Sequence, residues 1–300
     1  MYPPAHNAGA EHMLHSMLSY AVKQGHEAIV VIEGEGGCKL TKPYVLDGVK
    51  VSSDRRTLKG VDTLLTHLDS TPDAEAWAEK HGKPLVQVMH NHHRPDMAEK
   101  CDLAIYNTHW LLDVAPMPFE CPTVVLHPPV FADTYRVKPK GDFITLINLQ
   151  KAKGGEMFYA LAAAMPHLNF LGVKGSYGIQ LMPPPHLKNV TIIENQPDIR
   201  CVYEQTRILL MPSSYESYGR CAVEAAVSGI PTIAHRTQGL WEALGEAGSF
   251  PLPDSESWKA AINYVIDTYP LRSRLARSLG DSLDPEGDMD RCLEAMEALL

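Results

Sequence analysis

The segment between residues 208 and 234 constrains the fold more than any other part of the chain. The apolar run Ile208–Met211 is typical of a short buried strand, which Pro212 closes. After Gly219 come mainly small and apolar residues up to Pro231, which predicts a tightly packed helix, and Thr232–Ala234 begins another strand. Strand, loop, helix and strand form one crossover unit of a parallel sheet. The loop of such a unit lies at the carboxyl end of a strand, where these sheets bind ligands.

Two glutamates, Glu216 in the loop and Glu224 in the helix, lie on either side of Gly219. Free N–H groups at the helix start would receive an anion such as phosphate, and a glycine lets the backbone approach it closely. Each carboxylate could accept hydrogen bonds from a diol. The arrangement favours a nucleotide-diphosphate sugar. From the spacing alone, a capped helix with two solvated glutamates is the alternative.

The surrounding residues favour the ligand site. From Pro212 to Pro231 the pattern Pro-Ser-x-x-Glu-x-x-Gly-x-x-x-x-Glu-Ala-x-x-x-Gly-x-Pro resembles the donor-site signature of the retaining glycosyltransferases of family 4, which have the GT-B fold. Four further segments are similar to family elements in the same order: Tyr2–Pro4 with Asn7–Glu11, Gly25–Glu27 with the strand after it, Asp198–Met211, and Gly239–Glu242.

Helices and strands are expected to alternate along the whole chain, as in parallel sheets covered on both faces. In the first half, strands are predicted at 28–32, 49–52, 63–67, 84–90, 102–106 and 124–126, and helices at 9–24, 72–82 and 108–113. In the second half, strands are predicted at 143–147, 168–173, 190–194, 208–211 and 232–234, and helices at 154–165, 198–205, after Gly219, and at 254–269. An amphipathic helix at 287–300 is expected to pack on the body of the protein rather than on a membrane.

The resulting expectation is an α/β protein of the GT-B fold. It has two Rossmann-like domains facing across a cleft, residues 1–135 on the acceptor side and 136–300 binding the nucleotide sugar, with a C-terminal helix. The family begins with a buried strand ahead of the Pro-Pro element, for which Met1-Tyr2 leaves almost no room. The resemblance therefore predicts either a late start or an N-terminal sheet without a central strand.

Composition excludes several classes of protein. With 45% apolar and 21% charged residues among 300, the chain is typical of a globular protein of two modest domains. No apolar stretch approaches the ~20 residues that span a bilayer, and no signal peptide is evident, so a cytoplasmic location is expected. Six scattered cysteines without a Cys-x-x-Cys pair indicate reduced thiols. A net charge of −9 argues against broad non-specific binding of nucleic acid.

A lysine-containing loop follows the predicted strand at 143–147 and opens a helix. The family motif there is Arg-x4-Lys-Gly, whose two cations hold the donor diphosphate. Lys153 matches the lysine, whereas Asn148 stands where the family has arginine. Lys151 or Arg220 could supply the second cation. The alternatives are a solvated lysine at position 153 and an ordinary surface arginine at position 220.

Three histidines, at positions 90, 92 and 93, stand at the end of the predicted strand at 84–90. Side chains alternate along a strand and no carboxylate or cysteine stands nearby at ligand spacing, so no metal is expected. The family places a histidine at this strand end, facing the donor sugar, and His90 matches it. A histidine satisfied by backbone groups is the alternative, and His92 or His93 could border the acceptor. The resemblance further implies donor contacts by the N-terminal loop at Gly9, by Glu194 near the nucleobase, and by Ser217 and Tyr218.

The mechanism that the resemblance implies is retaining transfer of a hexosyl group from a nucleotide-diphosphate sugar, with UDP or GDP as the nucleotide. Glu224 would bind the ribose, Glu216 the sugar hydroxyls, and Lys153 with the helix start the departing diphosphate, so neither a metal nor another cofactor is expected. A sugar-nucleotide epimerase or hydrolase, or a donor-binding module without catalysis, are the alternatives. The acceptor is open between small molecule, glycan, protein and modified nucleic acid. The basic stretch Lys50–Lys59, with Arg55 and Arg56, could guide an anionic acceptor, but a solvated basic turn is the favoured alternative.

Overall fold

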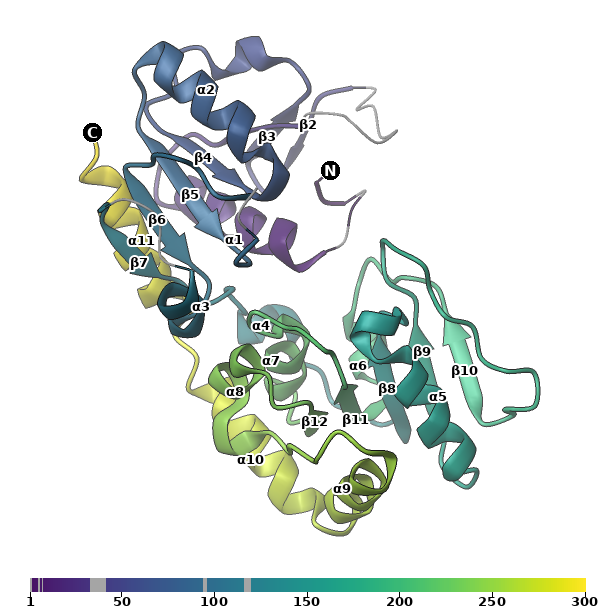
Figure 1. Ribbon diagram of the computed structural model, residues 1–300. Helices are drawn as coiled ribbons and strands as arrows, with labels where there is room; N and C mark the ends of the chain where they lie inside the picture. The colour runs from purple at the N-terminus through teal and green to yellow at the C-terminus, as the bar shows by residue number, and fades with distance from the viewer. Residues whose placement is uncertain (1, 5, 7, 33–41, 94–95, 116–119) are drawn as a thin grey trace. The chain divides into compact units, whose positions relative to one another are not determined.

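A computed structural model describes residues 2–4, 6, 8–32, 42–93, 96–115 and 120–300 (Figure 1). Asn7, the glycine-rich loop Glu33–Gly37 and Cys38 lie outside these residues. The chain forms two compact units: unit 1 comprises Met1–Pro129 with Asp284–Leu300, and unit 2 comprises Val130–Leu283. The unit boundary thus precedes the expected domain boundary by a few residues, and the terminal helix belongs to unit 1 rather than to unit 2.

The strands of unit 1 form two separate sheets among the described residues. A three-stranded sheet has the order β1-β3-β2 and a four-stranded sheet the order β4-β5-β6-β7. Every pairing is parallel except the hairpin of β2 and β3, which is joined by Asp47 and Gly48 with φ of 47° and 83°. The bounds are β1 Ile29–Val31, β2 Tyr44–Leu46, β3 Val49–Ser52, β4 Leu64–His67, β5 Leu85–Met89, β6 Leu103–Tyr106 and β7 Thr123–Val125.

Helices cover both faces of the four-stranded sheet of unit 1. Leu85, Met89 and Ala104 pack in one cluster with residues of α2 and α3. On the opposite face, α11 contacts β6, β7 and α1. The bounds are α1 Gly9–Lys23, α2 Thr71–His81, α3 His109–Val114 and α11 Pro285–Glu297, with the 3-10 turns η1 Arg55–Leu58 and η2 Leu68–Ser70. Described residues of the chain contain no helix that is both long and apolar enough to cross a membrane.

Unit 2 is built on one parallel five-stranded sheet of order β10-β9-β8-β11-β12. Its strands are β8 Phe143–Ile147, β9 Phe170–Val173, β10 Val190–Ile193, β11 Thr206–Met211 and β12 Thr232–Ala234. Its helices are α4 Ala132–Tyr135, α5 Gly155–Ala164, α6 Arg200–Tyr203, α7 Arg220–Ala226, α8 Gln238–Leu244, α9 Ser255–Asp267 and α10 Tyr269–Asp281, with the turns η4 Lys151–Lys153 and η5 Gly245–Ala247.

Alternation along β11 explains the two layers of unit 2. Ile208 and Leu210 pack with Phe158 of α5 and Trp258 of α9, whereas Leu209 and Met211 pack with α7 and α8 residues. Each strand residue is buried on its own face, which is why β11 reads in sequence as a continuous apolar run. Unit 2 therefore has the three-layer α/β architecture that the sequence predicts.

Candidate functional site

Most of the predicted donor residues lie at one edge of the unit 2 sheet. Asn148 directly follows β8, Glu194 follows β10, and the loop from Pro212 to Gly219 follows β11. All these strands are parallel, so their carboxyl ends share one edge, the edge at which doubly wound sheets bind ligands. The structure thus gathers these residues at the edge predicted for the site.

Lys153 and Glu216, 63 positions apart in sequence, form an ion pair at this edge. The distance from Lys153 Nζ to Glu216 Oε1 is 2.6 Å, and Ser213 Oγ donates a 2.9 Å hydrogen bond to the same oxygen. The side chains are 26% and 13% exposed. Burial acts to lower the pKa of Lys153, but the Glu216 carboxylate outweighs burial, and the pKa is raised above its usual value. Lys153 is therefore a cation at neutral pH.

Backbone packing between two loops brings Lys153 to Glu216. The turn η4 ends at Gly154, whose φ is +89°, and a Cβ at this position would lie 2.3 Å from Pro212 Cγ. Ser214 N donates to Ala152 O at 2.9 Å, which ties the loop after β11 to the turn after β8. Glycine at 154 is required both by the left-handed conformation and by this close approach.

Glu224 is part of a buried network rather than a solvated helix residue. Arg220 Nε donates to Glu224 Oε1 at 2.7 Å, and Tyr203 Oη donates to Glu224 Oε2 at 2.7 Å. Arg220 Nη2 also donates to Tyr135 Oη at 2.6 Å. Both ionic side chains are only 8% exposed. The alternative of two solvated glutamates is therefore wrong for Glu224, and that of a surface arginine is wrong for Arg220.

One nitrogen of Arg220, Nη1, takes no part in this network. Burial acts to lower the pKa of Arg220, but Tyr135 and Glu224 together raise the pKa above its usual value, so the guanidinium stays charged. Nη1 is buried and has no hydrogen-bond partner among the residues that the structure describes. Tyr135 and Tyr203 complete the network. They could not be predicted from the sequence, because neither tyrosine belongs to a recognisable motif.

Asn148 replaces an arginine of the family pattern and has a structural use of its own. Its φ is +73°, a left-handed conformation that asparagine tolerates better than most residues. Its Oδ1 accepts hydrogen bonds from Gln150 N at 3.3 Å and Gln180 Nε2 at 3.2 Å, and its side chain lies against Gly175. The side chain is thus occupied in bracing the loop.

The remaining predicted donor residues of unit 2 differ in exposure. Lys151 is exposed and pairs with Glu156 at 3.1 Å, while exposed Glu194 pairs with Lys174 at 2.6 Å. Ser217 is half-buried and Tyr218 is buried in a cluster with Val130 and Val223. Gly219, with φ of +101°, precedes α7, which is only seven residues long. The structure therefore makes Lys153, rather than Lys151, the shielded lysine of the site.

His90 lies in unit 1, at the end of β5, and contacts a second histidine. The distance from His90 Nε2 to His67 Nδ1 is 3.2 Å. Burial, and secondarily the neighbouring His67, lower the pKa of His90 to about 3, so its ring is neutral at physiological pH. His67 was missed in the sequence because it stands alone at the end of β4. Gly9, the first residue of α1, is exposed, and a Cβ there would meet nothing within 4 Å.

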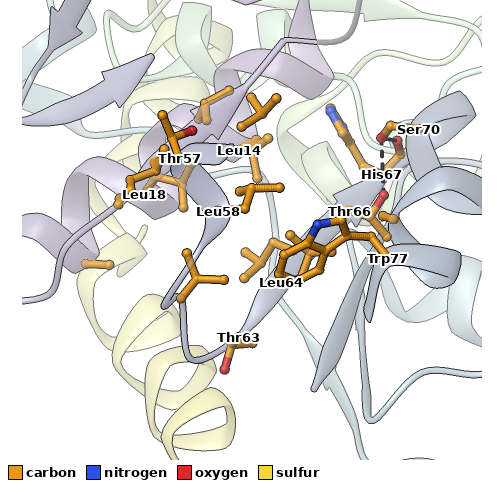
Figure 2. Close-up of a pocket in the computed structure, with 18 of the residues that line it drawn as sticks. Leu14, Leu18, Thr57, Leu58, Thr63, Leu64, Thr66, His67, Ser70 and Trp77 are labelled. Carbon is orange, nitrogen blue, oxygen red and sulfur yellow. Dashed lines mark hydrogen bonds between the residues drawn. The ribbon is translucent and has the colours of Figure 1, made fainter. Parts of the chain in front are cut away.

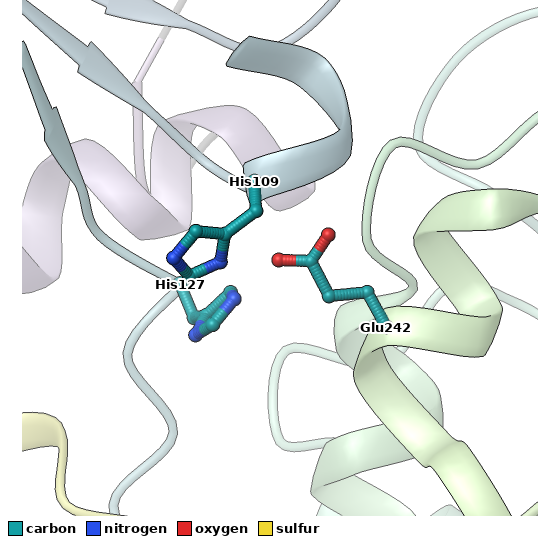
Figure 3. Close-up of side chains that lie close together, drawn as sticks. All are labelled: His109, His127 and Glu242. Carbon is teal, nitrogen blue, oxygen red and sulfur yellow. The ribbon is translucent and has the colours of Figure 1, made fainter. Parts of the chain in front are cut away.

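His92 and His93, which follow His90 in sequence, contact other residues. The His92 ring lies edge-on to Trp110 at 6.2 Å, and His93 Nδ1 lies 3.4 Å from Asp96. Figure 3 shows two further histidines of this unit, His109 and His127, whose ring centroids are 5.7 Å apart.

The basic stretch Lys50–Lys59 is largely neutralised. Lys50 pairs with Glu27 at 2.9 Å, Arg55 with Asp73 at 2.9 Å and Arg56 with Asp54 at 2.8 Å. All three pairs are exposed, so water and salt screen them strongly. With a carboxylate beside each of these cations, the stretch offers little net attraction to an anionic acceptor.

Part of unit 2 matches a known protein family. Residues 186–278, which include Glu216 and Glu224, match the family described as Glycosyl transferases group 1. The architecture is that of GT-B glycosyltransferases, which confirms the predicted fold class. The predicted resemblance to the glycosyltransferases of family 4 is likewise confirmed.

Two curated glycosyltransferases are similar in sequence to part of the chain. The chain is 25% identical over 180 residues to a D-inositol 3-phosphate glycosyltransferase of Mycobacterium sp. (strain KMS), covering 51% of this chain and 41% of the relative. It is 33% identical over 93 residues to that of Corynebacterium glutamicum (strain R), covering 29% and 22%. The chain thus spans less than half the length of these curated relatives.

Two solved structures cover nearly the whole chain. Anabaena HepE in complex with UDP-glucose superposes with a TM-score of 0.78 at 14% identity, covering 97% of both chains. A glycosyltransferase from Rickettsia africae ESF-5 gives a TM-score of 0.73 at 14% identity, covering 97% of this chain and 95% of the other. At this identity the likeness shows the fold.

Proposed function

We propose that this protein is a retaining, metal-independent glycosyltransferase that moves a hexosyl group from a nucleotide-diphosphate sugar to a hydroxyl acceptor. The observation that carries the proposal is the Lys153–Glu216 pair at the carboxyl edge of the unit 2 sheet. A shielded cation beside a shielded carboxylate offers a donor for phosphate oxygens and an acceptor for sugar hydroxyls within one small volume.

Lys153 and Glu216 pair with each other in the structure. When a donor binds, its phosphate oxygens take hydrogen bonds from Lys153 Nζ, and a sugar hydroxyl donates to Glu216 in place of the ammonium. Glu224 uses both oxygens in the buried network, and each carboxylate oxygen retains a second lone pair for a ribose hydroxyl. Arg220 and Tyr203 would then fix the direction in which that carboxylate points.

The reaction would break the bond between the anomeric carbon and the diphosphate oxygen while the acceptor oxygen attacks that carbon from the same face. The acceptor proton would pass to the departing phosphate oxygen. Lys153 would stabilise the negative charge that grows on the diphosphate, a role that a divalent cation fills in other enzymes.

UDP-glucose is the first donor to test, because the Anabaena HepE structure holds it. D-Inositol 3-phosphate is the first acceptor to test, because the mycobacterial relative is named for it. Donor binding is measured by calorimetry with UDP, GDP and their sugars, and transfer by product detection across an acceptor panel. Binding of no nucleotide at all would contradict the proposal.

Lys153→Ala is expected to weaken binding of the nucleotide diphosphate at least tenfold and to abolish transfer, while the fold survives. The matched control is Lys259→Ala: Lys259 also pairs with a glutamate at 2.6 Å, and its side chain is 27% exposed, but it lies on α9. The control should bind as the wild type does. Equal affinity of the two variants would remove Lys153 from the site.

A further inference from the structure

Two histidines outside the predicted motifs stand where parallel strands end. In unit 1, His67 ends β4 and lines a cavity of about 820 Å³ (Figure 2). In unit 2, His235 directly follows β12, at the edge of the sheet that also carries Lys153 and Glu216. His235 therefore lies in the same unit, and at the same edge, as the proposed donor residues.

The backbone of His235 makes the last bond of the ladder between β11 and β12. Its N–H donates to Met211 O at 3.0 Å. Its own carbonyl turns away from β11 and accepts from Thr237 N at 2.8 Å. The main chain at His235 is thus fixed at the point where the loop after β11 begins.

The ring of His235 holds the loop where the backbone ladder stops. His235 Nδ1 lies 3.2 Å from Ser213 O. A carbonyl oxygen only accepts hydrogen bonds, so Nδ1 carries a proton and donates it to this contact. The side chain therefore reaches from the end of β12 to the loop, two positions beyond Met211.

Packing fixes the plane of this ring. The ring centroids of His235 and Trp258 are 5.2 Å apart at an interplanar angle of 81°, and Trp258 is fully buried in α9. His235 Nε2 is buried and has no hydrogen-bond partner among the residues that the structure describes. Within that part of the chain, the ring makes its polar contact through Nδ1, at Ser213.

Ser213 connects the His235 bond to the candidate site. Ser213 is 2% exposed, and its Oγ donates to Glu216 Oε1 at 2.9 Å, the same oxygen that Lys153 Nζ contacts. Ser213 is thus held at its carbonyl by His235 and holds Glu216 through its hydroxyl. Without the bond from His235, the backbone at Ser213 loses a contact that sets its direction, and the Oγ atom moves with it.

We propose that His235 is a positioning residue, whose Nδ1–H holds the Ser213 carbonyl and thereby fixes the direction in which Glu216 meets the sugar of the donor. The inference rests on the proposed function, because that function assigns the sugar hydroxyls to Glu216. Loss of the Nδ1 bond would weaken binding of the sugar more than binding of the diphosphate, which Lys153 contacts. A ring that served only to pack against Trp258 would be replaceable by any apolar side chain of similar size.

The first test compares three substitutions at position 235. Asparagine carries its amide nitrogen at the same bond separation from Cβ as Nδ1, glutamine carries it one bond farther, and leucine fills the space without a polar group. Calorimetry with UDP and UDP-glucose should show that His235→Gln and His235→Leu lower the affinity for UDP-glucose relative to UDP by on the order of fivefold. His235→Asn should keep the wild-type ratio of the two affinities.

His167→Leu, at an exposed position of the same unit, is the matched control and should also keep that ratio. An unchanged ratio in His235→Leu would overturn the proposal. A loss in His235→Asn as large as that in His235→Leu would overturn it too, because the imidazole would then act through its shape and not through Nδ1–H.

A second measurement needs no sugar donor. In protein with isotope-labelled histidine and glutamate, NMR should show a protonated Nδ1 at His235. The signal of the Glu216 carboxyl carbon should shift in His235→Leu and return in His235→Asn. An Nδ1 without a proton, or a Glu216 signal that is the same in wild type and His235→Leu, would exclude the positioning role. Wild-type protein that binds neither UDP nor UDP-glucose would contradict the proposed transferase, and the NMR result would then decide the role of His235 alone.

Discussion

The lowered pKa of His90 makes the stability of unit 1 depend on pH. Burial lowers its pKa in the folded state from 6.5 to about 3. Between these two values the unfolded chain binds a proton that the folded chain does not, so the contribution of His90 to stability is present above pH 6.5 and is lost as the pH falls. The slope due to one such group approaches about 1.4 kcal/mol per pH unit.

We therefore expect His90→Gln to flatten the acid side of the stability profile. Urea unfolding at pH 7, 6 and 5 should show the wild type losing free energy of unfolding faster than the variant as the pH falls. His81→Gln, at an exposed position of the same unit, is the control and should keep the wild-type slope. Identical slopes for wild type and His90→Gln would show that His90 is not a buried neutral group.

The proximity of Lys153 and Glu216 could be inferred from the sequence, because each lies in a motif that follows a parallel strand. The contacts of Asn148 and Arg220 could not be inferred in this way. The left-handed backbone of Asn148 and its contacts to Gln150 and Gln180 depend on how two loops meet. The burial of Arg220 depends on Tyr135, 85 positions away. A residue type reveals what a side chain can do, and its partners come from the tertiary structure.

At the scale of elements, the contact between the turn η4 and the loop after β11 sets the geometry of the candidate site. Gly154→Ala would place a Cβ 2.3 Å from Pro212 Cγ and 2.7 Å from Pro212 O, so the two loops must separate. Backbone strain adds roughly 1 kcal/mol, because alanine disfavours positive φ. We expect a loss of about 2–4 kcal/mol in the free energy of unfolding, together with weaker nucleotide binding.

Gly25→Ala separates the two causes of this loss. Gly25 has φ of +99°, close to that of Gly154, but a Cβ there would meet nothing within 4 Å. Chemical unfolding and calorimetry should show a cost of roughly 1 kcal/mol and unchanged nucleotide affinity for this control. If Gly154→Ala behaves like Gly25→Ala in both measurements, the loop contact does not hold the site together.

Most elements are predictable because their apolar periodicity is strong, as in α1, β3 and β8, where the predicted and observed bounds nearly coincide. Among the described residues, the elements missed in the sequence are β2, α4, α8 and α10. β2 is a three-residue edge strand with exposed Val45 at its centre, although the Asp47-Gly48 pair before β3 is a strong hairpin signal. α10 follows α9 directly at Tyr269-Pro270, and its polar composition concealed a stripe that buries Arg272 and Ala276.

At the scale of the whole molecule, the two ends of the chain meet in unit 1. Tyr20 Oη of α1 donates to Asp290 Oδ1 of α11 at 2.5 Å, and His26 pairs with Glu297 at 3.1 Å. The amphipathic stripe of α11 predicts that one face is buried, as it is at Met289 and Cys292. An amphipathic pattern does not specify which surface the helix packs on. The position of α11 at the end of the chain had suggested that it belongs to the second domain.

The packing of α11 on unit 1 predicts which elements a substitution in α11 destabilises. Met289 is 3% exposed, so Met289→Asp buries a carboxyl group without a partner or forces α11 off unit 1, at a cost of about 3 kcal/mol or more. Amide hydrogen exchange should accelerate in α1, β6 and β7, the elements that α11 contacts, and stay unchanged in β8, β11 and α5 of unit 2. Because the proposed donor residues on the sheet edge belong to unit 2, nucleotide affinity should also be retained.

Glu294→Asp, at an exposed position of the same helix, is the control and should leave exchange unaltered in both units. Faster exchange throughout residues 143–211 would mean that the terminal helix supports the second unit, contrary to the packing described here.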